Sequence, residues 1–209
     1  MRILKLFIPL LLLLIGGMIG SYGAEIENLV SNPDFEEGTN GWKLNVGGNS
    51  AGLIKAEKGG VTGDFCLFAQ IDAVGPDNWN PEIHSPSFEV KAGKIYTCAF
   101  WAKTEQGKTR PLYVKFEQLD TWEGPSKTFT ITDEWAEYYF SPNMTVQSPP
   151  SVVIHIAFQQ QKEDVWLDHF RVYQGEYVEE KLPQPGGKGI AVQPAGKLVT
   201  LWADIRSHR

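Results

Sequence analysis

The segment that decides the fold predicted for this chain is Trp166-Leu167-Asp168-His169-Phe170-Arg171-Val172-Tyr173. Apolar side chains alternate with other residues along most of it, which is the pattern of a half-buried β-strand. One carboxylate, Asp168, stands in the apolar row. Because a buried carboxylate is costly unless it is paired, hydrogen-bonded or bound to a metal, Asp168 needs a partner from another part of the chain.

An earlier segment offers that partner. Its sequence is Asn28-Leu29-Val30-Ser31-Asn32-Pro33-Asp34-Phe35-Glu36, and it ends in a turn rich in oxygen atoms. We predict that these two ends of one domain meet and share a calcium ion, which is bound by about six to eight oxygens. In the alternative, Asp168 only accepts hydrogen bonds from turn amides. Its role is structural in both cases.

Between Ile26 and Tyr177 the chain consists of short alternating runs separated by Gly, Pro, Asn and Asp. This pattern is typical of an all-β antiparallel sandwich or barrel. We predict strands at residues 53–57, 65–72, 82–90, 95–104, 112–119, 126–132, 135–141, 152–160 and 165–173.

Alternation also assigns the side chains of each strand to two faces, because successive residues of a strand point to opposite sides. The predicted core rows are Tyr96, Cys98, Phe100, Ala102; Leu112, Val114, Phe116; Trp135, Tyr138, Phe140; and Val152, Ile154, Ile156, Phe158. The opposite rows are Thr97, Ala99, Trp101, Lys103; Tyr113, Lys115, Glu117; and Val153, His155, Ala157, Gln159.

The two ends of the chain have a different composition. Residues 1–23 combine a basic start, a short apolar run and small residues, which predicts a secretory signal peptide, with an uncleaved anchor as the alternative. The protein is then secreted or extracytoplasmic, in the periplasm or at the cell surface. Residues 178–196 form a Pro/Gly-rich linker, and residues 197–209 an amphipathic segment that either packs on the domain or frays, or serves as a docking or sorting tag.

Charge and composition limit the partners. The formal net charge of -6 argues against nucleic acid or an anionic membrane, and we expect a monomer that is not on the membrane after signal cleavage. The chain has no nucleophile elbow, zinc-protease helix or phosphate-binding loop, so we do not expect an enzyme. Cys66 and Cys98 can form a disulfide in such a compartment or remain buried thiols.

Five motifs occur in order over residues 28–175: Asn32 to Gly38 with Trp42, Gly63 to Leu67, Tyr96 to Lys103, Trp135 to Phe140, and Leu167 to Phe170. Together they resemble the carbohydrate-binding modules of families four, nine and twenty-two, which accompany bacterial polysaccharide hydrolases. The resemblance implies a jelly-roll β-sandwich of two antiparallel sheets, a structural calcium ion and a sugar-binding face or loop cleft.

The resemblance and the alternating rows together give the candidate site residues. Glu36 lies in the family's turn beside the closing strand, and the predicted calcium ligands are Glu36, Asp168, Asp34 and Asp64. Indole and phenol rings stack on the C–H face of a sugar, while polar side chains bind its hydroxyls. The predicted carbohydrate-binding residues are Trp101, Tyr113, Lys115, Glu117, His155, Gln159, Trp79 and Trp122. Each tryptophan can instead pack against its own domain.

Two functional hypotheses follow. The first is a secreted, non-catalytic carbohydrate-binding module that binds a poly- or oligosaccharide on the face around Trp101 and is associated with glycoside hydrolases. The second is a structural or adhesive jelly roll at the cell surface that binds a protein partner, with the C-terminal tail contributing to attachment. An open groove with exposed rings favours the first, whereas a flat apolar patch favours the second.

Overall fold

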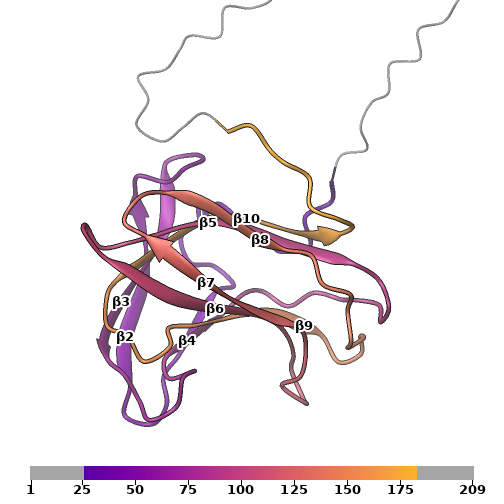
Figure 1. Cartoon of the computed structure of the whole chain (residues 1–209), viewed down its shortest axis with the longest axis horizontal. Helices are drawn as coiled ribbons and strands as arrows, with labels where there is room; N and C mark the ends of the chain where they lie inside the picture. Colours follow the sequence, from indigo (N-terminus) through magenta and orange to yellow (C-terminus); the bar gives the residue numbers. More distant parts are fainter. Residues whose placement is uncertain (1–25, 183–209) are drawn as a thin grey trace, which may run out of the picture.

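The computed structural model describes residues 26–182, which form ten β-strands (Figure 1). In this range no helix has the length and apolar character needed to cross a bilayer. The strands are β1 (Lys43–Asn45), β2 (Ala51–Lys58), β3 (Phe65–Ala73), β4 (Glu82–His84), β5 (Tyr96–Thr104), β6 (Thr109–Gln118), β7 (Ser126–Thr132), β8 (Ala136–Phe140), β9 (Val152–Ala157) and β10 (Val165–Gln174).

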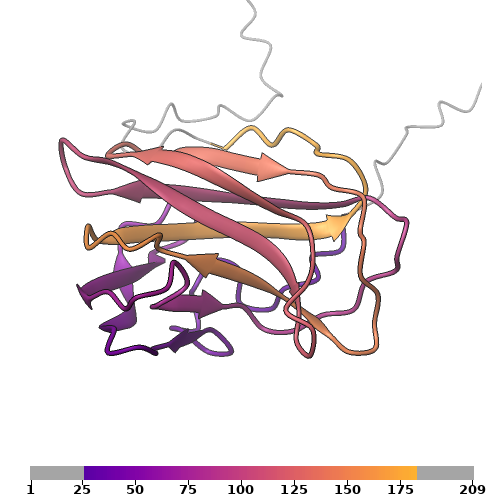
Figure 2. The ribbon, with the colours of Figure 1, turned by 60° about the horizontal axis from the view of Figure 1, so that its bottom comes forward.

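The strands form two five-stranded antiparallel sheets that face each other (Figure 2). One sheet has the order β1-β4-β9-β6-β7 and the other β2-β3-β10-β5-β8. Successive strands from β3 to β10 alternate between the sheets except at β6–β7, and the orders β3-β10-β5-β8 and β4-β9-β6-β7 are those of an eight-stranded jelly roll. The predicted all-β jelly-roll sandwich is therefore confirmed.

All nine predicted strands are present, most with ends that differ by no more than three residues, and two larger differences occur. The strand predicted at residues 82–90 ends at His84, because Ser85 is followed by Pro86, which has no N–H to donate to a sheet. The additional strand β1 has only three residues, too few to show alternation in the sequence.

The core lies between the two sheets, and the predicted inward rows of β5, β6 and β9 are all part of it. In the row predicted for β8, Phe140 is buried and Tyr138 is partly buried against the core. Trp135 precedes β8 and is half-buried. The ammonium of Lys103, from the outward row of β5, lies 5.3 Å from the centre of the Trp135 ring, so the predicted core position of Trp135 is wrong. β5, β6 and β9 follow the period-two rule.

The two ends of the domain meet as predicted, with the N-terminal segment running beside the end of β10 (Figure 1). The amide of Leu29 donates to the carbonyl of Val172 at 2.7 Å, and the side chain of Asn28 bonds both the Val172 amide and the Phe170 carbonyl. The ring of Phe35 packs against Trp42 at 5.0 Å and Phe170 at 6.1 Å. This junction closes the core at one end.

Residues 175–182 return over the outer face of the second sheet. Tyr177 stacks on Tyr139 with ring centroids 3.6 Å apart, and its hydroxyl donates to Glu137 at 2.6 Å. The amide of Val178 donates to the Tyr173 hydroxyl at 2.8 Å. The beginning of the predicted linker thus packs on the domain, while the rest of residues 178–196, the predicted signal peptide and the amphipathic segment 197–209 lie outside the described residues.

Cys66 and Cys98 are both buried free thiols. Cys98 faces the core, whereas Cys66 pairs across the sheet with Glu57 on the outer face, where its thiol donates to the Glu57 carbonyl. Burial raises the pKa of Cys66 to about 12. Because the two sulfurs lie on opposite faces of one sheet, the structure favours the thiol alternative over the disulfide.

Candidate functional site

A cleft of about 740 Å³ lies over the outer face of the β1-β4-β9-β6-β7 sheet. The side chains of β4, β6, β7 and β9 that point away from the core form its floor, and two loops with one tryptophan each form its walls. The lining residues are Asn78, Trp79, Glu82, His84, Tyr113, Lys115, Glu117, Trp122, Thr128, His155, Ala157 and Gln159.

The two wall tryptophans are among the most exposed aromatic side chains of the described chain. Trp79 is 53% exposed and Trp122 is 69% exposed. Backbone hydrogen bonds hold both loops: the Gln159 amide donates to the Asn78 carbonyl at 3.2 Å, and the Trp122 amide donates to Gln118 at 2.9 Å. The rings are therefore presented to solvent from fixed loops, not buried under them.

The floor carries a polar network between adjacent strands. His155 Nδ1 lies 2.7 Å from a carboxylate oxygen of Glu117, which Lys115 contacts at 3.2 Å. Burial alone would raise the pKa of Glu117, but the hydrogen bonds from His155 and Lys115 outweigh it and hold the pKa below its usual range. Tyr113 meets the His155 ring edge-on at 5.9 Å. Glu117 is accordingly a fixed carboxylate with oriented neighbours.

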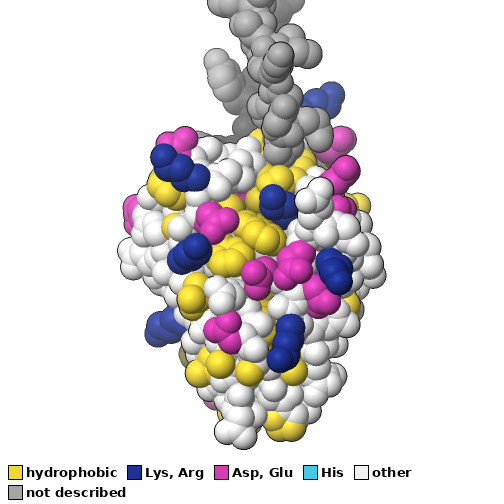
Figure 3. Space-filling view, turned by 90° about the vertical axis from the view of Figure 1, so that its left-hand side faces the viewer, with side chains coloured by type: hydrophobic (Ala, Val, Ile, Leu, Met, Phe, Trp, Pro, Cys, Tyr) yellow, Lys and Arg dark blue, Asp and Glu magenta, His cyan; other side chains and the backbone are white. Residues whose placement is uncertain are grey.

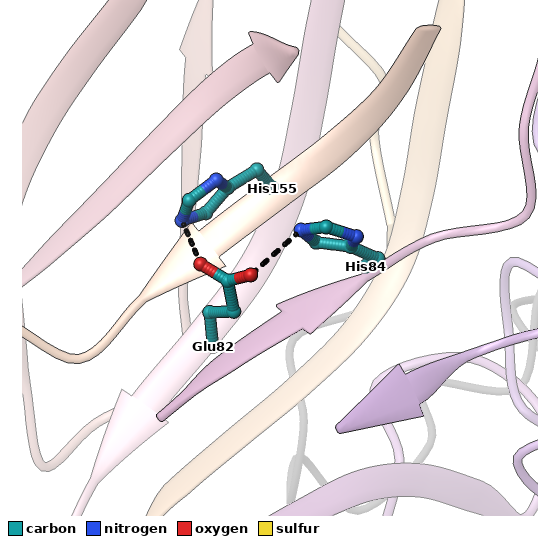
Figure 4. Close-up of side chains that lie close together, drawn as sticks. All are labelled: Glu82, His84 and His155. Atoms are coloured by element: carbon teal, nitrogen blue, oxygen red, sulfur yellow. Dashed lines mark ion pairs between the residues drawn. The ribbon is translucent and has the colours of Figure 1, made fainter. Parts of the chain in front are cut away.

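Glu82 and His84 complete the floor, although the sequence analysis did not identify them as site residues. They lie on β4, next to β9, and both His84 and His155 face the Glu82 carboxylate (Figure 4). The Nε2 atoms of His84 and His155 are each 3.1 Å from a different Glu82 oxygen. The sequence Glu82-Ile83-His84 does alternate around a core isoleucine, but three residues are too few to assign faces from sequence.

The chemistry of this cleft suits a ligand with apolar C–H faces and many hydroxyl groups. The exposed rings of Trp79 and Trp122 offer stacking surfaces, and Tyr113 adds a phenol on the floor. Amide, carboxylate, ammonium and imidazole groups stand between the rings and can donate to or accept from hydroxyls. Seven of the eight predicted carbohydrate-binding residues therefore lie around one cleft.

The eighth, Trp101, does not line this cleft. It lies on β5 in the other sheet, and only 7% of its surface is exposed. Its row does face away from the core. Asp168 and Glu137 flank it on the neighbouring strands. Residues 175–182 pack on the same face, where Tyr177 bonds Glu137. The expected platform around Trp101 is thus absent, because alternation predicts the face of a strand but not its sheet or its cover.

The carboxylates predicted to bind calcium lie at the junction of the domain ends. Asp168 is fully buried and accepts hydrogen bonds from the amides of Val61 and Thr62, at 2.5 and 3.1 Å, and from its neighbour His169. Burial raises the pKa of Asp168 to about 7, although these amides oppose the shift. The turn-amide contacts foreseen in the alternative are therefore present.

The other predicted ligands surround the same turn. One oxygen of Glu36 accepts hydrogen bonds from the Asp64 and Phe65 amides, each at 2.9 Å, and Asp34 lies 2.7 Å from His169 Nδ1. No three of these carboxylates converge to within 4.8 Å of one another, since residues 26–182 contain a single such group, on the cleft floor.

Two oxygen atoms come close together beside Gly60. A Cβ at Gly60 would lie 2.2 Å from the Phe65 carbonyl oxygen and 2.8 Å from Asp168 Oδ2, so these two oxygens border a position that only glycine leaves open. Calcium accepts such mixtures of carboxylate and backbone oxygens. Asp168 and the Phe65 carbonyl are the groups that would hold such an ion.

A further face of the domain has a different character. On the face in Figure 3, hydrophobic side chains lie between acidic and basic ones, and no histidine is visible. His84 and His155 line the cleft.

Solved structures of known proteins share the fold. One described as "CBM4 structure and function" matches with a TM-score of 0.58 and 21% identity over 70% of this chain and 99% of that one. The CBM22-1-CBM22-2 tandem domain of Xyn10C from Paenibacillus barcinonensis matches with a TM-score of 0.52 and 18% identity, over 82% of this chain and 50% of that one. TmCBM61 in complex with β-1,4-galactotriose matches with a TM-score of 0.50 and 16% identity, over 71% of this chain and 99% of that one. The fold is that of a carbohydrate-binding-module β-sandwich.

The family follows from the sequence match. Residues 27–163 match the family model CBM_4_9, described as "Carbohydrate binding domain", which is more than half of the chain. The chain therefore belongs to this family, and it is a non-catalytic carbohydrate-binding module, as predicted. No curated protein sequence matches the chain significantly.

Proposed function

We propose that the module binds an oligo- or polysaccharide chain in the cleft over the β1-β4-β9-β6-β7 sheet. The observation that carries this proposal is the convergence of Trp79 and Trp122, on separate loops, with an ordered polar network on the strands between them. An adhesive face for a protein would instead be flat and apolar.

Each part of the cleft has a role in this proposal. Trp79 and Trp122 stack on the C–H faces of successive sugar rings, and Tyr113 supports the ring between them. Lys115, Glu117 and Gln159 bind the hydroxyls, and His155 orients Glu117. Two or three platforms with a few hydrogen bonds correspond to affinities of roughly millimolar to micromolar, about -4 to -8 kcal/mol.

We further propose that calcium occupies the junction at Asp168 in a structural role. The support is a fully buried carboxylate whose hydrogen-bond donors, within the described chain, are backbone amides alone. A cation would offset the cost of that burial. Export by the predicted signal peptide and association with a glycoside hydrolase through the C-terminal tail complete the proposal.

Binding is tested with an array of β-glucans, xylans, mannans and galactans, followed by calorimetry on the strongest ligand. We expect at least one glycan to bind and Gln159→Ala to weaken it. Glu134→Gln, a change on the exposed turn before β8, is the matched control and should have no effect. If no glycan binds, or if Gln159→Ala binds as tightly as the control, the cleft is not the binding site.

A further inference from the structure

The imidazoles of His84 and His155 are unusual in the cleft. Their Nε2 atoms are buried, and neither has a hydrogen-bond partner within the described chain. Each lies 3.1 Å from a Glu82 oxygen, but neither contact has hydrogen-bond geometry. An unpartnered buried nitrogen is costly in a folded protein, so two of them facing one carboxylate call for a ligand.

We propose that His84 Nε2, His155 Nε2 and the Glu82 carboxylate bind a divalent zinc ion. The three ligand atoms lie within 4.8 Å of one another, and within residues 26–182 no other group of three His, Cys, Asp or Glu side chains comes so close (Figure 4). Ligand atoms of a tetrahedral zinc ion are about 3.3 Å apart when the metal bonds are about 2.0–2.1 Å. The observed separations of 3.1 Å, one from each histidine to a different oxygen of Glu82, are close to that value.

The orientation of His155 also suits a metal. Its Nδ1 lies 2.7 Å from Glu117, so the ring donates its Nδ1–H to that carboxylate and leaves the Nε2 lone pair toward Glu82. A carboxylate that holds the far nitrogen of a ligating histidine is the usual arrangement around protein-bound zinc. His155 is only 6% exposed, which fixes the ring in this position.

The charges around the three ligands are compatible with a cation. Glu117 lies 3.6 Å from His84 and is the nearest further carboxylate. The ammonium of Lys115 is held by Glu117 and by the Trp122 carbonyl. Its positive charge is thereby offset, and Glu82 remains to neutralise the ion.

Zinc fits this donor set better than calcium does. Two imidazoles and one carboxylate are typical ligands of zinc, whereas calcium takes oxygen ligands. Three protein ligands leave one tetrahedral position free, and because all three residues line the cleft, that position opens on the proposed sugar site. This metal site is distinct from the junction at Asp168, which lies in the other sheet.

The test is calorimetry of the full chain, stripped of metal by a chelator that is then removed, with zinc chloride as the titrant. We expect one zinc ion per chain. His84→Ala and Glu82→Gln should each weaken binding by more than about tenfold. Glu117→Gln, which removes the carboxylate that holds His155 and offsets Lys115, should weaken it by about 10–100-fold. Glu134→Gln should bind zinc as the unchanged protein does, and calcium chloride should not compete. Thermal melts show that each variant is folded.

Two results would overturn the site: no zinc binding by the unchanged protein, or binding that folded His84→Ala and Glu82→Gln variants retain in full. Glycan binding measured in the presence of chelator separates this inference from the proposed function. If glycan binds but zinc does not, only the metal site is wrong. If zinc binds with this pattern but no glycan does, the metal site stands and the proposed function fails.

Discussion

Replacing the two wall tryptophans one at a time should weaken glycan binding, whereas replacing an aromatic residue outside the cleft should not. A tryptophan side chain offers roughly 250 Å² of surface. At 69% exposure Trp122 presents roughly 170 Å², and at 53% Trp79 presents roughly 130 Å². A sugar ring that covers one face of the indole removes about half of that area from water.

At about 25 cal/mol per Å², the lost contact corresponds to about 2 kcal/mol for Trp122→Ala and about 1.6 kcal/mol for Trp79→Ala. These values predict affinities lower by roughly 30-fold and 15-fold. Both variants should keep the melting temperature of the unchanged protein, because neither ring belongs to the core.

The matched comparison is Trp101→Phe. This ring is 7% exposed and lies in the other sheet, so the substitution should lower the melting temperature and leave the affinity unchanged. Calorimetry with the strongest array ligand measures the affinities, and thermal melts measure the stability. The reasoning is refuted if the folded Trp101→Phe variant binds more weakly than the two cleft variants, or if those two bind as tightly as the unchanged protein.

Three further predictions concern the rest of the domain. Phe35→Ala removes a fully buried ring from the junction with Trp42 and Phe170 and should lower the free energy of unfolding by about 3–5 kcal/mol in denaturant titrations; a loss below 1 kcal/mol would contradict the packing described. If calcium binds at Asp168, a chelator should lower the melting temperature, and it should do so equally in variants that lack the zinc ligands. An unchanged melting temperature would contradict the calcium site. Because burial raises the pKa of Cys66 to about 12, its thiol should resist alkylation at pH 8 until the protein is unfolded, whereas rapid labelling of the native protein would show it to be accessible.

Most of the fold could be predicted from sequence because strands of five or more residues carry a readable period of two. Phe100 and Val114 were assigned to the core and lie there. The closing strand does meet the N-terminal segment as predicted, through Asn28 and Leu29. The partner of Asp168, however, is the turn at Val61 and Thr62, because the irregular register between Asp168 and Arg171 places Asp168 opposite Trp101 on the outer face. These inferences depend only on local pattern and burial cost.

The site was harder to predict because it depends on how strands associate. Tyr113 and His155 could be placed on outward rows, but their meeting follows from β6 pairing with β9, which alternation does not specify. Trp101 has the same outward pattern in the other sheet. The cover over that sheet comes from residues 175–182, at the border between the predicted domain and the predicted linker. No strand pattern there indicates that Tyr177 packs on Tyr139. Glu82 was missed because its strand is too short to show a period.

The central claim, that a sugar chain lies in the cleft between the two loop tryptophans, is tested most directly by NMR. The protein is labelled with nitrogen-15 at its tryptophan indoles and titrated with the strongest oligosaccharide from the array. The indole signals of Trp79 and Trp122 should shift together with a single dissociation constant, while that of Trp101 stays in place. A titration in which Trp101 shifts and the two cleft indoles do not would contradict the account.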